Sequence, residues 1–184
     1  MTRTQYFTAT SLDGFIADQD NSLDWLFDVE RAEADRTFGT FFAEVGAMAM
    51  GATTYEWVLD HEHLLDHPER WHAYYADTPC WVFTHRAMPE IPGTFRFVEG
   101  DVAPVHQEMT HAAAGRNIWL VGGGDLVGQF VDRRLLDDIV VGVAPVTLGR
   151  GAPLLPRRLT AGELELVDVR RDMQLAQLTY RLRN

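Results

Sequence analysis

Three stretches of the sequence place glycine, hydroxyl or arginine residues directly after a short apolar run, a pattern suited to binding phosphate. In the strongest, the apolar run 118–121 passes through three glycines, residues 122–124, into Asp125 and Leu126. Glycines let the backbone approach a ligand closely, and the free amides of a helix start favour an anion such as pyrophosphate. The same glycines would also suit a tight strand-to-helix turn, so this motif alone leaves both interpretations open.

The other two stretches also follow apolar runs and could bind phosphate, but with different side chains. Residues 51–54 (Gly-Ala-Thr-Thr) follow one apolar run, and residues 84–86 (Thr-His-Arg) follow the next. Threonine hydroxyls can hold phosphate oxygens, and a guanidinium makes forked, charge-assisted contacts with a phosphate monoester. Three such junctions at successive strand ends predict one dinucleotide lying across the carboxyl edge of a sheet.

The charge balance excludes several classes of function. The net charge is -11, with 27 acidic and 16 basic residues, so nucleic acid and anionic membranes are not expected partners. All the basic residues are arginine, which excludes Schiff-base chemistry and the lysine of a P-loop. The single Cys80 is expected to be buried, and the absence of a signal-like or membrane-spanning run predicts a cytoplasmic protein.

Histidines and aromatic residues between positions 57 and 75 have two interpretations each. His61 and His63 lack the spacing of a zinc helix, so a solvated loop is favoured over a metal site. The aromatic residues could line a substrate pocket or belong to the core or a dimer contact, with a structural role favoured. They are Trp57, Trp71, Tyr74 and Tyr75.

The predicted elements alternate between strands and helices and then end in strands alone. Short β-rich runs predict strands at residues 6–10, 47–50, 81–83, 95–98, 118–121, 139–143, 164–169 and 175–182. Apolar spacing predicts helices at residues 28–44, 55–59, 102–114 and 126–134. This order predicts a single α/β domain over residues 1–184, with helices on both faces of a mostly parallel sheet and an antiparallel hairpin at one edge.

Four motifs carry a resemblance to a known family: Ser11–Ala17, Met50–Glu56, Val121–Gly124 and Val143–Leu154. They stand in the order found in the dihydrofolate reductase family, and the match covers nearly the whole chain. More narrowly, the chain resembles the branch related to the C-terminal reductase domain of bacterial riboflavin biosynthesis. The resemblance implies a three-layer fold around an eight-stranded sheet, NADPH as hydride donor, a small-molecule substrate and a homodimer.

The resemblance also implies roles for individual residues. The nicotinamide is expected near Ala9 and Ile16, the pyrophosphate near residues 51–54 and 122–126, and the 2′-phosphate near residues 84–86. The expected cofactor-binding residues are therefore Ala9, Ile16, Gly51, Ala52, Thr53, Thr54, Thr84, His85, Arg86, Val121, Gly122, Gly123, Gly124, Asp125 and Leu126.

Substrate and catalytic residues match the family more loosely. Classical dihydrofolate reductases carry a tryptophan after the first strand and, on the next helix, a carboxylate that grips the pterin and assists protonation. Asp24 and Trp25 correspond to the former, and Glu30, with Asp28 nearby, to the latter. Both acids would also suit the first turn of a helix, which is the favoured interpretation. Asp13 could orient substrate or cap its turn.

Together these features predict an NADPH-dependent oxidoreductase, similar to dihydrofolate reductase and to 5-amino-6-(5-phosphoribosylamino)uracil reductase. It would pass a hydride to a small heteroaromatic substrate, pterin- or pyrimidine-like, or to a carbonyl. The alternatives are a non-catalytic dinucleotide-binding protein and a flavin-dependent reductase. The sequence has no deaminase zinc signature, which excludes a complete bifunctional riboflavin enzyme.

Overall fold

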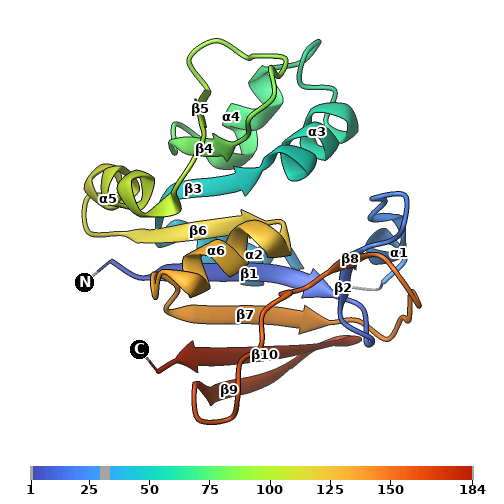
Figure 1. Ribbon diagram of the computed structural model, residues 1–184. Helices are drawn as coiled ribbons and strands as arrows, with labels where there is room; N and C mark the ends of the chain where they lie inside the picture. Colours follow the sequence, from blue (N-terminus) through green and yellow to red (C-terminus); the bar gives the residue numbers. More distant parts are fainter. Residues whose placement is uncertain (1, 30–33, 184) are drawn as a thin grey trace.

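The fold is built on an eight-stranded sheet. The computed structural model describes residues 2–29 and 34–183. Within that part the strand order is β5-β4-β3-β6-β1-β7-β10-β9, and a second, two-stranded sheet pairs β2 with β8 (Figure 1). The pairs from β5 to β7 are parallel, whereas β10 runs antiparallel to both β7 and β9. This confirms the predicted mostly parallel sheet with an antiparallel C-terminal hairpin.

The elements have the following bounds. The strands are β1 (Thr4–Thr10), β2 (Phe15–Ala17), β3 (Val45–Gly51), β4 (Cys80–Phe83), β5 (Phe95–Val98), β6 (Asn117–Gly122), β7 (Asp138–Val143), β8 (Ala152–Pro153), β9 (Leu164–Asp172) and β10 (Leu175–Leu182). The helices are α1 (Asp24–Phe27), α2 (Ala34–Ala43), α3 (Ala52–His61), α4 (Glu69–Tyr75), α5 (Val102–Ala113) and α6 (Gly124–Asp132).

Helices cover both faces of the sheet because the central strands are apolar on both sides. In β3, Ala47 and Ala49 belong to a core cluster that includes residues of α5 and α6. Met48 and Met50, which point to the opposite face, pack in a second cluster with residues of α2, α3 and α4. The same division holds along β4 and β6, so the molecule has three layers, with α6 in front of the sheet and α2 behind it (Figure 1).

Two differences from the sequence-based elements concern the site. The predicted helix 28–44 is wrong in its N-terminal part, because α1 ends at Phe27 and Asp28 is its C-cap, whereas α2 is described from Ala34. The short strand β2 (Phe15–Ala17) is not among the strands predicted from the sequence. It pairs with β8, and the bond from the Leu154 amide to the Gly14 carbonyl extends the contact between these distant segments.

The antiparallel hairpin brings its turn to the edge of the sheet where the parallel strands end. Ala176 of β10 lies opposite Val143, the last residue of β7. Because β10 runs the other way, it begins where β1 and β7 finish. The end of β9 and the start of β10 therefore join the carboxyl ends of the parallel strands. Among the helices of the described residues, none is long and apolar enough to cross a membrane.

Candidate active site

Two helix starts converge at the carboxyl edge of the sheet. Strands β3 and β6 are neighbours, with Met50 opposite Gly122, and each leads through a glycine N-cap into α3 or α6. In the described part of the chain, neither cap makes a side-chain hydrogen bond. The first backbone N–H groups of a helix have no intrahelical partner, and the helix dipoles add positive potential there. The two ends therefore offer the donors and the positive potential that suit an anion with more than one phosphate.

The three consecutive glycines have three different roles. Gly122 has φ +139°, a backbone conformation that favours glycine, and its peptide bond to Gly123 is cis. Gly123 has an ordinary extended conformation, φ −79° and ψ 177°, and a Cβ there would point toward Ile16, 4.0 Å from its Cδ1. At Gly124 a Cβ would overlap the carbonyl oxygens of Pro153 and Leu154. Of the three, Gly123 alone combines a backbone conformation open to any residue with free space beside the cavity described below.

A cavity of about 260 Å³, the glycine cavity, lies beside the two helix starts. Thr53 and Thr54 bring hydroxyls to it from α3, and Ile16 and Trp57 supply apolar walls. Because its walls combine free amides, hydroxyls and apolar side chains, it suits the pyrophosphate and nicotinamide part of a dinucleotide. Its lining is Thr8, Ile16, Ala17, Asn21, Leu23, Thr53, Thr54, Trp57, Val121, Gly122, Gly123, Gly124, Asp125, Ala152 and Pro153.

A second cavity of about 360 Å³, the aromatic chamber, adjoins the first, because Thr8 and Val121 line both. Its apolar wall is mainly aromatic and its polar groups are few, as in many small-molecule sites. The lining consists of Phe7, Thr8, Ala9, Leu26, Thr37, Phe38, Trp119, Val121, Gly142, Asp172, Leu175 and Gln177. A molecule here and a molecule in the glycine cavity would meet at Thr8 and Val121.

Helix α1 lies between the two cavities. Leu23, its N-cap, lines the glycine cavity, and Leu26 lines the aromatic chamber. The Phe27 ring stacks on His61 with centroids 5.0 Å apart, and His61 stacks on Trp57 at 4.4 Å. This three-ring stack connects α1 to α3 beside the glycine cavity, which Trp57 also lines.

The two residues expected to bind substrate lie on α1 but outside the chamber lining. Asp24 is exposed, and Trp25 packs with the small cluster of Val29, Ala144 and Leu175. The Trp25 indole N–H is buried and has no hydrogen-bond partner in the described residues. Because Leu175 lines the chamber, Trp25 supports the chamber wall from behind.

Asp13 connects two loops. Its carboxylate accepts a hydrogen bond from the Ser11 hydroxyl (2.6 Å) and from the backbone amides of Leu148 (3.0 Å) and Gly149 (2.7 Å). These bonds, the one from Ser11 first, lower the pKa of the Asp13 carboxyl below its ordinary value. A carboxylate with three donors is well suited to fixing a turn, so this geometry favours the capping interpretation.

The third stretch that was expected to bind phosphate, residues 84–86, lies next to α3. Strand β4 pairs with β3, so residues 84–86 follow at the same sheet edge. The Arg86 guanidinium donates to the Glu56 carboxylate of α3 at 3.1 Å, and the Arg86 amide donates to the Thr84 hydroxyl. Both members of this ion pair are about half exposed, so an anion can reach the guanidinium.

The remaining expected residues divide between the cavities, the backbone and the surface. Ala9 lines the aromatic chamber, whereas the Leu126 side chain belongs to the core, leaving only its backbone for a ligand. Gly51 and Ala52 form the start of α3. Asp28 is exposed at the C-terminal end of α1, where a helix dipole does not favour an acid, and Glu30 lies outside the described residues.

Several lining residues were missed in the sequence. Asp172 and Gln177 come from the β9–β10 hairpin, and Phe7, Phe38 and Trp119 form the aromatic wall. Among the four aromatic candidates of residues 57–75, Trp57 lines the glycine cavity, whereas Trp71 is buried in the core beside the partly buried Tyr75, and Tyr74 is exposed. No group of three or more metal-ligating side chains occurs in the part of the chain that the structure describes.

Comparisons with known proteins find similar sequences and similar structures. Residues 4–178 match the family model described as the RibD C-terminal domain. The uncharacterized protein YwjB of Bacillus subtilis (strain 168) is 31% identical over 178 residues, which is 97% of either chain. A crystal structure of a putative riboflavin biosynthesis protein from Shewanella sp. PV-4 is 28% identical, with TM-score 0.78 and full coverage of both chains.

A more distant structure shows the fold alone. Dihydrofolate reductase from Enterococcus faecalis, complexed with NADP(H) and RAB-propyl, is 13% identical, with TM-score 0.60. The match covers 99% of this chain and 97% of that one. The expected dihydrofolate-reductase-like fold is therefore confirmed.

Proposed function

The chain belongs to the RibD C-terminal domain family, and from that premise we propose that it is an NADPH-dependent reductase of small molecules. The substrate is a heteroaromatic compound with a C=N bond, pterin- or pyrimidine-like, or a compound with a C=O bond. The observation that carries the proposal is the glycine cavity, where two uncapped helix starts meet beside a chamber large enough for one ring.

The residues fit a bound NADPH at each end of the cavity. The amides at the starts of α3 and α6, with the hydroxyls of Thr53 and Thr54, would hold the pyrophosphate. Ile16 would contact the nicotinamide side, and Ala9 lies in the adjoining chamber. When bound, NADPH supplies a hydride to the carbon of the substrate's C=N or C=O bond, a proton from solvent joins the heteroatom, and NADP⁺ leaves.

The chain's own contribution is alignment and exclusion of water. Thr8 and Val121 form the wall shared by both cavities, so the two reactants would approach each other there. Leu23, the N-cap of α1, brings an apolar side chain to the glycine cavity, and Leu26 of α1 brings one to the aromatic chamber.

The proposal is tested by cofactor binding and turnover. We expect calorimetry to give saturable NADPH binding, and absorbance at the NADPH band to fall steadily in the presence of a pterin, a pyrimidine or a quinone. Binding without oxidation of NADPH by any compound of these classes would favour a non-catalytic protein. A yellow purified protein would favour a flavin-dependent reductase.

Cofactor preference depends, in this proposal, on Arg86. A 2′-phosphate would accept charge-assisted hydrogen bonds from this guanidinium, and NADH lacks that phosphate. We expect Arg86→Ala to weaken NADPH binding roughly tenfold or more and to leave NADH binding nearly unchanged, as measured by calorimetry.

Glu56 provides the matched control, because it is the present partner of Arg86. Glu56→Gln removes a competing carboxylate, so NADPH affinity should rise or stay the same. If Glu56→Gln weakens NADPH binding as Arg86→Ala does, the pair acts by stabilising α3, and the contact with the 2′-phosphate is wrong.

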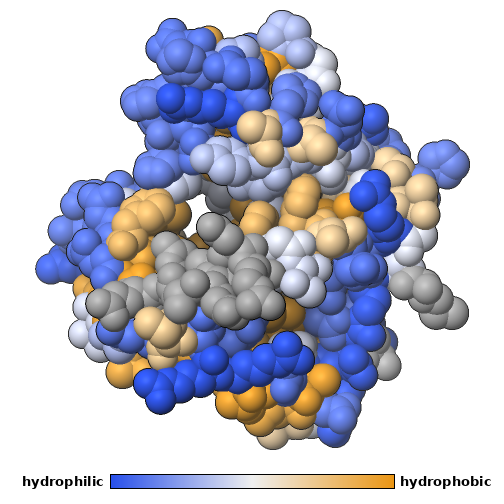
Figure 2. Space-filling model, turned by 180° about the vertical axis from the view of Figure 1, so that it is seen from behind, coloured by the Kyte–Doolittle hydropathy of each residue, from blue (hydrophilic) through white to orange (hydrophobic). Residues whose placement is uncertain are grey.

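The proposed enzyme is a homodimer, and β9 offers the surface for a second copy. Leu166 and Val169 are 52% and 57% exposed, yet they lie opposite Tyr180 and Leu178, which pack against the main core. The apolar face of the sheet thus continues from β10, where it packs against the core, onto the edge strand β9, where it is exposed to solvent. Figure 2, seen from behind, shows hydrophobic side chains at the lower edge of the molecule, the edge at which β9 lies.

We expect sedimentation to give a species of twice 20.8 kDa and Val169→Glu to give a monomer. Glu165→Gln, on the other face of β9, should leave the dimer intact. A wild-type monomer at tens of micromolar protein would contradict the dimer, and a dimeric Val169→Glu variant would exclude this surface.

A further inference from the structure

We propose that Asp172 is the carboxylate that recognises the substrate, and that the substrate is a planar ring with an N–H donor edge, neutral or cationic. The proposal deepens the reductase function, because it takes the aromatic chamber as the substrate site. Asp172 lies on the β9–β10 hairpin, far in sequence from the N-terminal acids considered above.

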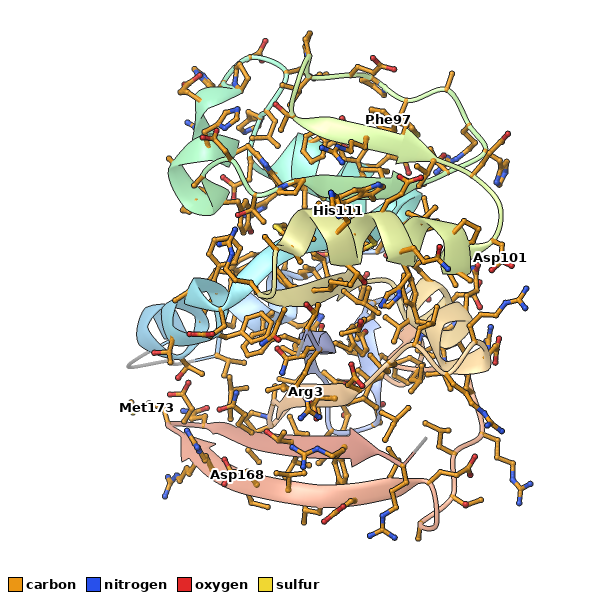
Figure 3. The ribbon with its side chains drawn as sticks, turned by 90° about the vertical axis from the view of Figure 1, so that its left-hand side faces the viewer. Arg3, Phe97, Asp101, His111, Asp168 and Met173 are labelled. Atoms are coloured by element: carbon orange, nitrogen blue, oxygen red, sulfur yellow. The ribbon has the colours of Figure 1, made fainter. Side chains whose placement is uncertain are left out.

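Strand register directs Asp172 to the chamber. Asp172 is the last residue of β9 and pairs with Leu175, and Gln177 lies two residues further along β10. Residues paired across strands share a face, as do residues two apart, so all three side chains lie on one face. Leu175 and Gln177 line the chamber with Asp172. Figure 3 shows Met173 at the hairpin tip, with Asp168 farther along β9.

The Asp172 carboxylate has no hydrogen-bond or ion-pair partner in the described part of the chain, although it is partly buried. Two other carboxylates have partners within the chain: Asp168 pairs with Arg170, and Asp13 accepts three hydrogen bonds. A partly desolvated carboxylate is costly without a donor. Asp172 is therefore available for a donor that a ligand brings.

The chamber's charge selects the kind of ligand. Among its described lining residues Asp172 is the only one that carries a charge, and the other polar side chains are those of Thr8, Thr37 and Gln177. An anionic ring would meet this carboxylate with no cation among the described residues of the chamber lining, whereas an N–H edge would donate charge-assisted hydrogen bonds to it. The Gln177 amide beside it can donate to a ring carbonyl or nitrogen.

The walls select a planar shape. Phe38 lies 6.1 Å from Phe7 and 5.3 Å from Trp119, measured between ring centroids, and the latter pair meets edge to face. All three rings line the chamber, and aromatic surfaces favour offset or edge contacts with another ring. A flat heteroaromatic compound therefore fits better than a bulky aliphatic one.

The position of Asp172 also fixes which end of the ring it holds. The chamber shares Thr8 and Val121 with the glycine cavity, but it shares Phe7, Thr37, Asp172 and Gln177 with a further cavity of about 480 Å³ on the opposite side. Asp172 thus holds the end of the ring away from the nicotinamide. The reducible bond is left beside Thr8 and Val121.

Two rings of similar shape test the proposal: 2,4-diaminopyrimidine, which offers an N–H edge, and 2,4-dimethylpyrimidine, which does not. We expect the wild-type protein, saturated with NADPH, to bind the diamino ring roughly ten- to hundredfold more tightly, as measured by calorimetry or by quenching of tryptophan fluorescence. Asp172→Asn should reduce this ratio nearly to one. Asp168→Asn, on the same strand and face, should keep it.

Equal affinities of the wild-type protein for the two rings, no binding of either, or an unchanged ratio in Asp172→Asn would overturn the assignment. The wild-type comparison needs no variant, so it holds if a substitution impairs folding. Failure of NADPH to bind would contradict the proposed function instead. The same comparison on the cofactor-free protein then decides the role of Asp172, because residues of the chain itself line the chamber.

Discussion

Gly123→Val is expected to abolish NADPH binding in a chain that still folds. Gly123 has φ −79°, which a valine adopts without strain, and its missing side chain faces the glycine cavity, 4.0 Å from Ile16. A valine would fill the space between the helix start and Ile16, where the dinucleotide backbone would lie. Its methyl groups would also cover the free amides at the start of α6. A loss of affinity of roughly a hundredfold or more is expected.

Calorimetry with NADPH measures this loss, and the melting temperature and circular dichroism report on the fold. The expected variant keeps a cooperative thermal transition and shows no binding heat. A folded Gly123→Val protein with wild-type affinity would exclude the helix start of α6 from the cofactor site. It would leave the three glycines with a purely structural role.

The strand ends and helix starts at the carboxyl edge of the sheet could be predicted from the sequence because they depend on local chemistry. An apolar run followed by glycine and hydroxyl residues specifies both a strand end and a helix start, and the parallel order β4-β3-β6 brings the three stretches side by side. The two central ones line or flank one cavity, and Arg86 lies on the neighbouring strand end, paired with α3. Each part could be recognised within about five residues.

The aromatic chamber could not be predicted in this way, because its wall comes from distant segments. Phe7, Phe38, Trp119 and Asp172 lie on four different elements, and each also fits an ordinary amphipathic pattern. The parallel strands reach the chamber with their carboxyl ends, whereas β10 reaches it with its first residues because it is antiparallel. A search of the sequence for residues after strand ends therefore does not find the residues of β10. The available signal was the hairpin turn after Asp172, which must lie beside the end of β7.

The roles of the individual glycines in the Gly-Gly-Gly motif could not be predicted from the sequence either. The letters alone do not reveal which glycine needs a positive φ, which faces a ligand and which is packed against another segment. The packing role, that of Gly124, depends on residues 153–157, which run along α6. Pro153 and Leu154 cover Gly124, and the Arg157 guanidinium lies over Gly128 while it pairs with Asp132. Only the tertiary structure brings this segment against the helix.

The contact of Pro153 and Leu154 with Gly124 predicts that a change from glycine to alanine has different effects on stability at positions 124 and 123. Gly124→Ala is expected to destabilise the protein by about 3 kcal/mol, because its Cβ would overlap two backbone carbonyls that cannot rotate away as a side chain would. For a chain of this size the melting temperature should fall by roughly 6–12 °C. Gly123→Ala should stay within about 1 kcal/mol of the wild type, because its backbone accepts a side chain and the space is open. Calorimetric melting of both variants without ligand measures the difference. Equal melting temperatures would mean that residues 153–154 do not pack on the start of α6, and the boundary of the glycine cavity drawn here would be wrong on that side.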